Sequence, residues 1–248
     1  MITTSVIPKE WADKSWPLIT SPQCQGHDIH SHFSVFMATD MYHVHNLFIR
    51  SMNSIYRQSP YVTKPADIAD LLFYTKCLVD CINAHHDGEE KYLFPGLIEY
   101  TKNLDIMATL LEYCVTTSPA DYSHQVFQGI IDSFATPLFQ HLSDEIGTIL
   151  ALKSFPSQDL KLLWTRAEKH INKVGSFDEM FPLAFGCIDN GFEAGQHKFP
   201  PVSKLVNFVV KYWFARKNQG AWRFNPCDMW GNPRPLYFLP EGERELET

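Results

Sequence analysis

Apolar side chains along this chain recur at steps of three and four residues, the spacing that gathers them on one face of an α-helix. The repeat is regular from Phe33 to Tyr56, and Ser59-Pro60 ends this first expected helix. The same pattern predicts further helices over residues 66–92, 103–115, 121–152, 158–174 and 202–217. Because no segment shows the apolar–polar alternation of a β-strand, the sequence predicts an all-α fold.

The ends of these helices carry residue types that start or interrupt helices. Asp67 is the expected cap of the second helix, and either Asp121 or Ser123 is expected to cap the fourth. Pro137 lies inside the fourth helix, where its missing N–H group and its ring are expected to produce a kink.

The order of the helices predicts three parts of the chain. The first four helices predict an antiparallel four-helix bundle over residues 32–153. An arm rich in Pro, Ser and Trp precedes the bundle at residues 1–31. Residues 154–248 hold the additional C-terminal helices and irregular segments, and we expect this extension to pack on the bundle.

The composition indicates a folded chain, since 45% of its 248 residues are hydrophobic. With 21 Lys and Arg against 28 Asp and Glu the net charge is −7, which argues against a nucleic-acid or anionic-membrane partner. No run of about 18 apolar residues marks a membrane span. The N-terminus lacks a secretory-signal pattern, and the six cysteines form no CxxC pair, so we expect reduced thiols and a cytoplasmic location.

Histidines and glutamates recur together on the expected helices. His85 and Glu89 are four residues apart on the second helix, and His141 and Glu145 repeat this spacing on the fourth. Residues four apart lie on one helix face, where an imidazole and a carboxylate can bind the same iron, zinc or manganese ion. His45 adds a donor on the first helix. The pattern therefore predicts a metal site in the core of a bundle.

The string His85-xxx-Glu89-Glu90-xx-Leu93-Phe94-Pro95 resembles the second-helix motif of hemerythrin-like, or HHE cation-binding, proteins. His45-Asn46 resembles the first-helix ligand of that family, and His141-xxx-Glu145 resembles its last-helix pair. The match covers residues 33–152, and the segment 222–227 is similar to the C-terminal extension of fungal members.

This resemblance implies a bundle around a non-haem iron centre, usually two irons bridged by carboxylates. The nitrogen ligands that it implies here are His45, His85 and His141, and the implied bridging carboxylates are Glu89 and Glu145. The apolar periodicity of the second helix fits His85 and His86 almost equally, and the spacing to Leu93-Phe94-Pro95 selects His85. His86 and Glu90 remain as reserve ligands.

The chain departs from the family pattern in the third helix, residues 103–115, which contains no histidine. The possible donors there are Met107, Glu112, Tyr113 and Cys114. Three sites are compatible with this sequence: a mononuclear iron site, a di-iron site completed by Glu112 or a thiolate, and an altered site with Mg²⁺ or no metal. Reversible oxygen carriage is the least expected of the family functions.

These observations favour a non-haem iron enzyme that carries out oxidative chemistry on a small apolar metabolite of specialised metabolism. A non-catalytic iron or oxygen sensor or store is the first alternative. The second is a bundle enzyme that no longer uses iron, such as one that cyclises isoprenoid diphosphates with Mg²⁺. Phosphate-binding loops, dinucleotide fingerprints and serine-hydrolase elbows are absent from the sequence.

Overall fold

The computed structural model describes residues 11–93, 104–195 and 198–243, and in these residues the fold is all-α. The helices are α1 (Phe33–Gln58), α2 (Pro65–Tyr92), α3 (Leu104–Thr116), α4 (His124–Ala151), α5 (Ser157–Val174), α6 (Met180–Cys187) and α7 (Lys204–Tyr212). Short 3₁₀ turns lie at Ser59–Tyr61, Leu152–Ser154, Phe192–Gly195, Phe214–Arg216, Ala221–Phe224 and Glu241–Glu243. The predicted fold class is confirmed, and Phe94 and Pro95 of the family-like string lie outside the described residues.

The structure corrects the sequence prediction at α6 and α7. The segment that forms α6 is apolar almost throughout, so it gives no periodic signal, and its Pro182 and Gly186 indicate an interruption rather than a helix. Pro182 is tolerated because it lies in the first turn, where the backbone N–H groups have no helical partner. The helix expected over residues 202–217 is shorter, because α7 ends at Tyr212 and a 3₁₀ turn follows.

The predicted caps have different outcomes. Ser123 is the N-cap of α4, and its Oγ accepts a hydrogen bond from the N–H of Val126. The prediction for Asp67 is wrong, because α2 begins with Pro65 at its first position and no side chain caps it. Asp67 instead accepts a hydrogen bond from the guanidinium of Arg223 at 2.7 Å. The helix α4 continues through Pro137.

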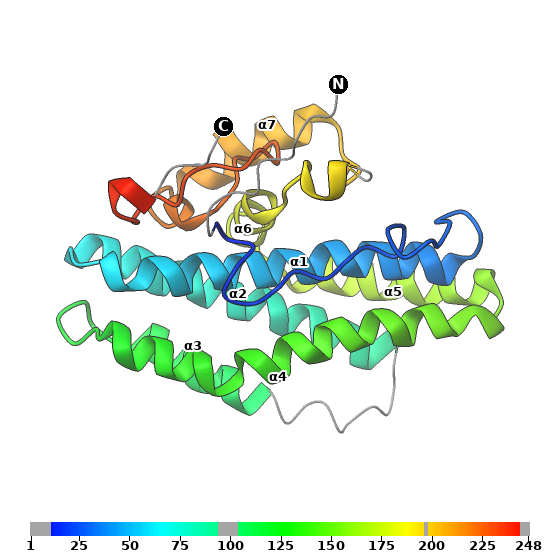
Figure 1. Cartoon of the computed structure of the whole chain (residues 1–248), viewed down its shortest axis with the longest axis horizontal. Coiled ribbons are helices and arrows are strands. Elements are labelled where there is room, and N and C mark those ends of the chain that lie inside the picture. Colours follow the sequence, from blue (N-terminus) through cyan, green and yellow to red (C-terminus); the bar gives the residue numbers. More distant parts are fainter. Residues whose placement is uncertain (1–10, 94–103, 196–197, 244–248) are drawn as a thin grey trace.

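The helices pack in an arrangement that differs from a bundle of four equal helices (Figure 1). The long helix α1 packs on α4, while α2 packs on α3 near one end and on α5 near the other. With 13 residues, α3 is half as long as α1, which has 26. The structure therefore does not confirm the antiparallel four-helix bundle of residues 32–153. The helix α6 packs on both α1 and α2 and connects them to α7.

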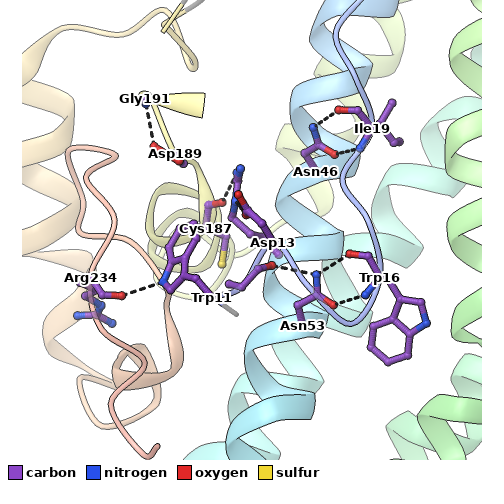
Figure 2. A network of polar contacts seen from close by, with 12 residues as sticks. Trp11, Asp13, Trp16, Ile19, Asn46, Asn53, Cys187, Asp189, Gly191 and Arg234 are labelled. Atoms are coloured by element: carbon purple, nitrogen blue, oxygen red, sulfur yellow. Dashed lines mark hydrogen bonds and ion pairs between the residues drawn. The ribbon is translucent and has the colours of Figure 1, made fainter. Parts of the chain in front are cut away.

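The N-terminal arm lies along the outer face of α1, and two asparagines hold its backbone there (Figure 2). Asn46 exchanges two hydrogen bonds with the backbone of Ile19, at 2.8 and 2.9 Å. Asn53 accepts a hydrogen bond from the N–H of Trp16 and donates to the carbonyl groups of Ala12 and Trp16. These side chains satisfy arm backbone groups that no helix or strand satisfies.

Arg50 lies between the two asparagines on this face of α1 and is 3% exposed. Its Nε donates to Asp13 Oδ1 of the arm at 2.7 Å, and a terminal nitrogen donates to the carbonyl of Cys187 at the end of α6. The guanidinium also lies over the rings of Trp11 and Phe192. One buried cation therefore holds the arm, α1 and the C-terminal segment together.

We expect Asp13→Ala to lower the free energy of unfolding by about 1–3 kcal/mol, because it leaves Arg50 buried without its carboxylate. Urea denaturation followed by circular dichroism measures this change, with the exposed neighbour Lys14→Ala as the control. Equal stability of the Asp13→Ala variant and the wild-type chain would contradict the role given to this ion pair.

Candidate metal centre

Three of the predicted ligands meet between α1 and α2. His45 lies in the middle of α1, and His85 and Glu89 lie one turn apart on α2. One ligand atom from each residue lies within 4.8 Å of the others, and all three side chains are buried. This is the only such group of three His, Cys, Asp or Glu residues within the described part of the chain.

A backbone contact fixes the orientation of His45. Its Nδ1 lies 2.8 Å from the carbonyl oxygen of Leu142 on α4 and donates to it, because a carbonyl oxygen only accepts. The Nε2 of a neutral His45 is then unprotonated, and it lies 3.1 Å from Nε2 of His85. His85 Nε2 lies in turn 2.9 Å from Oε1 of Glu89. The carbonyl of Leu142 thus orients His45 with its unprotonated Nε2 toward His85, another of the predicted ligands.

These separations fit a transition-metal ion. At a metal–nitrogen distance of about 2.1 Å, two ligand atoms at right angles around an ion lie about 3 Å apart. The contacts of His85 Nε2 with His45 and Glu89, at 3.1 and 2.9 Å, have this length. Two imidazoles with one carboxylate form the donor set of many non-haem iron sites.

The protonation states also suit a cation. Burial and the neighbouring His85 lower the pKa of His45 well below its usual range, so this imidazole is neutral at physiological pH. Burial raises the pKa of Glu89, but His85, His86 and His45 outweigh burial and bring it to about 2. The group of His45, His85 and Glu89 therefore offers at least one neutral nitrogen and a charged carboxylate.

A second group of predicted ligands lies beside the first. Oε2 of Glu145 is 3.7 Å from Nε2 of His45 and 3.9 Å from Nε2 of His141, one turn earlier on α4. The ring of His86 lies 5.6 Å from the ring of His141. Buried atoms Glu145 Oε2 and His86 Nε2 have no hydrogen-bond partner in the described residues. Such atoms are costly in a core unless a ligand satisfies them.

Electrostatics couples the two groups through their carboxylates. Burial and the charge of Glu89 raise the pKa of Glu145 well above its usual range. Burial lowers the pKa of His86 to about 4 and also lowers that of His141. The second group therefore presents neutral imidazoles and a carboxyl group that a nearby positive charge would ionise.

Two reserve candidates lie outside both groups. Glu90 points from the exposed side of α2, and Glu112 is exposed on α3. The other third-helix candidates, Met107, Tyr113 and Cys114, are also not members of the three-residue group. The structure brings the ring of His86 near that of His141 in the second group, while the adjacent His85 belongs to the first.

The sequence does not indicate that α5 packs beside the candidate site, because its pattern places residues 158–174 in the C-terminal extension. This helix packs on α2 at Gly88, next to Glu89, where an added Cβ would lie 3.0 Å from Cγ1 of Ile171. Glycine at this position lets α5 approach the helix that carries His85 and Glu89. No motif in α5 indicates this contact, because it depends on tertiary packing.

A curated relative is known for the whole chain. It is the "Dimeric xanthone biosynthesis cluster protein R11" of Cryptosporiopsis sp. (strain 8999), which is 66% identical over 98% of both chains. The chain belongs to the R11 family. No family model matches the sequence, so the hemerythrin-like resemblance has no support from that comparison, and no solved structure matches it.

One negative finding applies to this R11-family chain. Among the residues that the structure describes, none of the helices combines the length and the apolar character needed to cross a membrane.

The contact between α5 and α1 places two carboxylates near each other. Asp40 of α1 is partly buried, and burial together with Glu168 of α5 raises its pKa from 3.8 to about 7. The folded chain therefore binds this proton more tightly than the unfolded chain, and the wild-type protein loses stability as pH rises from about 4 to 7.

We expect Asp40→Asn to be more stable than the wild-type chain at alkaline pH, because the amide cannot ionise. Its advantage should grow by about 2–3 kcal/mol between pH 5 and pH 8. Urea unfolding at the two pH values measures this, and Glu168→Gln should produce a smaller change of the same sign. The exposed Asp87→Asn is the control. Parallel pH profiles for Asp40→Asn and the wild type would contradict this account.

Proposed function

We propose that this chain is a non-haem iron protein that uses His45, His85 and Glu89 as its first metal position. The observation that carries the proposal is the approach of their three ligand atoms, within 4.8 Å of one another, inside the apolar core. The Leu142 carbonyl supports the role of His45, since metal-binding histidines commonly donate their other ring N–H to a carbonyl or carboxylate.

We further propose a second metal position formed by His86, His141 and Glu145. Supporting this are the unpartnered buried atoms of His86 and Glu145 and the short distance between the rings of His86 and His141. His86 would take the part that a third-helix histidine has in hemerythrin-like proteins, and the bundle would be a variant of theirs in which α5 accompanies α3. Glu145 lies near both positions and is suited to bridge them.

Iron held by two histidines and a carboxylate supplies oxygen activation and oxidation chemistry when other positions are open to substrate. The chain's own residues have three roles in this proposal. Leu142 orients His45, the charge of Glu89 balances the cation, and Glu145 holds or releases a proton at its carboxyl group. The packing of α5 on Gly88 excludes water from one side of α2.

The relative supports the choice of substrate class. We propose that the chain acts on a xanthone or an aromatic precursor of one, because R11, at 66% identity, is named for the biosynthesis of dimeric xanthones. A small apolar aromatic molecule agrees with the substrate expected from the sequence. All six cysteines are free thiols and only Cys24 is exposed, which supports a reducing, cytoplasmic environment.

Anaerobic loading with Fe²⁺ tests the metal positions. After removal of unbound iron, we expect about two irons per wild-type chain. His85→Ala and Glu89→Ala should lose the first position with at least a ~100-fold weaker affinity, measured by elemental analysis and chelator competition. Circular dichroism verifies folding, and Glu90→Ala is a matched control because this glutamate is exposed one residue away.

The same titration separates the two positions. His141→Ala should reduce the iron content from about two to about one, because it removes a ligand of the second position only. Unchanged iron content in His85→Ala and Glu89→Ala would refute the first position. One iron in both the wild type and His141→Ala would refute the second position alone.

Genetic complementation tests the biosynthetic role. In a Cryptosporiopsis strain that lacks R11, expression of this chain should restore the dimeric xanthones, measured by liquid chromatography with mass spectrometry, because the two proteins share a family. A folded His85→Ala variant should not restore them, whereas Glu90→Ala should. Restoration by His85→Ala would show that the metal site is not required for this role.

A further inference from the structure

The outer side of α7 carries an exposed apolar stripe, which we call the α7 stripe. Its members and their exposed fractions are Leu205 (70%), Phe208 (54%), Val209 (37%), Tyr212 (49%) and, just after the helix, Trp213 (74%). The helical members follow the i, i+3, i+4, i+7 spacing that places them on one face. A contiguous exposed apolar face marks a surface that binds a partner or a membrane.

The opposite side of α7 fixes the stripe in this orientation. Val210 is fully buried, and Nδ2 of Asn207 donates to the carbonyl of Met229 at 2.6 Å. The helix also packs on α6. In Figure 1, α7 lies at the edge of the molecule away from α3 and α4. The apolar residues of the stripe therefore face solvent although α7 is anchored to the rest of the fold.

The segment that carries the stripe is basic in sequence. Residues 194–227 contain six of the 21 Lys and Arg residues and none of the 28 Asp and Glu residues, whereas the chain carries −7. Two of the six, Lys217 and Arg223, pair with aspartates of other segments. Lys204 and Lys211 border the helical part of the stripe, and exposed Arg216 follows Trp213. The −7 average, which argues against an anionic membrane as partner, does not describe this surface.

We propose that the α7 stripe docks on the surface of an anionic lipid bilayer. Its apolar side chains would enter the boundary between headgroups and acyl chains, where Trp and Tyr side chains are favoured, while the cations contact lipid phosphates. A second copy fits less well, because two stripes packed face to face would bring Lys204 and Arg216 of each chain near like charges. This inference does not depend on the metal centre.

Vesicle co-sedimentation of the full chain tests the proposal. The wild-type protein should bind vesicles of phosphatidylcholine with 30 mol% phosphatidylserine, about tenfold more weakly when phosphatidylserine is left out. Leu205→Ser with Trp213→Ser, and separately Lys204→Glu with Arg216→Glu, should each reduce the partition coefficient by at least about tenfold. These residues are exposed, so the variants are expected to fold, which circular dichroism verifies.

Matched variants on other surfaces serve as controls. Val115→Ser with Leu162→Ser removes exposed apolar residues outside the stripe, and Lys161→Glu with Lys169→Glu reverses exposed charges on α5. Both should bind like the wild type. The proposal fails if the wild type does not sediment with the anionic vesicles, or if the stripe variants bind equally well. It also fails if analytical ultracentrifugation shows a dimer that only the stripe variants dissociate and vesicle binding is absent.

Discussion

The burial of ionisable side chains around His45 constrains the whole centre of this molecule. His45, His85, Glu89 and Glu145 are each at most 6% exposed, in a core made mainly of aliphatic and aromatic residues. A charge removed from water costs several kcal/mol (~5) unless partners compensate, so the surrounding helices must supply those partners. The backbone of α4 supplies one to His45, and His85 Nε2 lies 2.9 Å from Oε1 of Glu89. Glu89 Oε1 and Glu145 Oε2 have no hydrogen-bond partner in the described residues, and a cation would satisfy both atoms.

This constraint explains why α1 carries polar side chains on two of its sides. Its inner side carries His45, while its outer side carries Asn46, Arg50 and Asn53, which bind the backbone and a carboxylate of the arm. A helix with two polar faces gains less from apolar burial, so its position depends on the elements that pair with those faces. The arm and the C-terminal segment are thus structural parts of the fold that holds His45.

The sequence predicted the long helices well, because their apolar periodicity reports directly on burial. It predicted neither α6, whose apolar run has no period, nor the true role of Asp67, which pairs with an arginine 156 positions away. Periodicity also left His85 and His86 unresolved, and in the structure His85 lies with His45 and Glu89 while the ring of His86 lies beside that of His141. Local pattern finds a face of a helix, but contacts such as Gly88 with α5 arise only when the chain has packed.

Two features of the chain reverse the ordinary distribution of residues, with polar groups in the core and a wide apolar stripe on the surface. Each arrangement reduces the stability of the isolated chain, since buried polar atoms lose water and exposed apolar atoms order it. Neither the buried polar groups nor the exposed apolar stripe is needed for the isolated chain to fold. A bound cation would compensate the first, and a lipid surface would cover the second. The two requirements are chemically different and lie on different elements, so each can be met without the other.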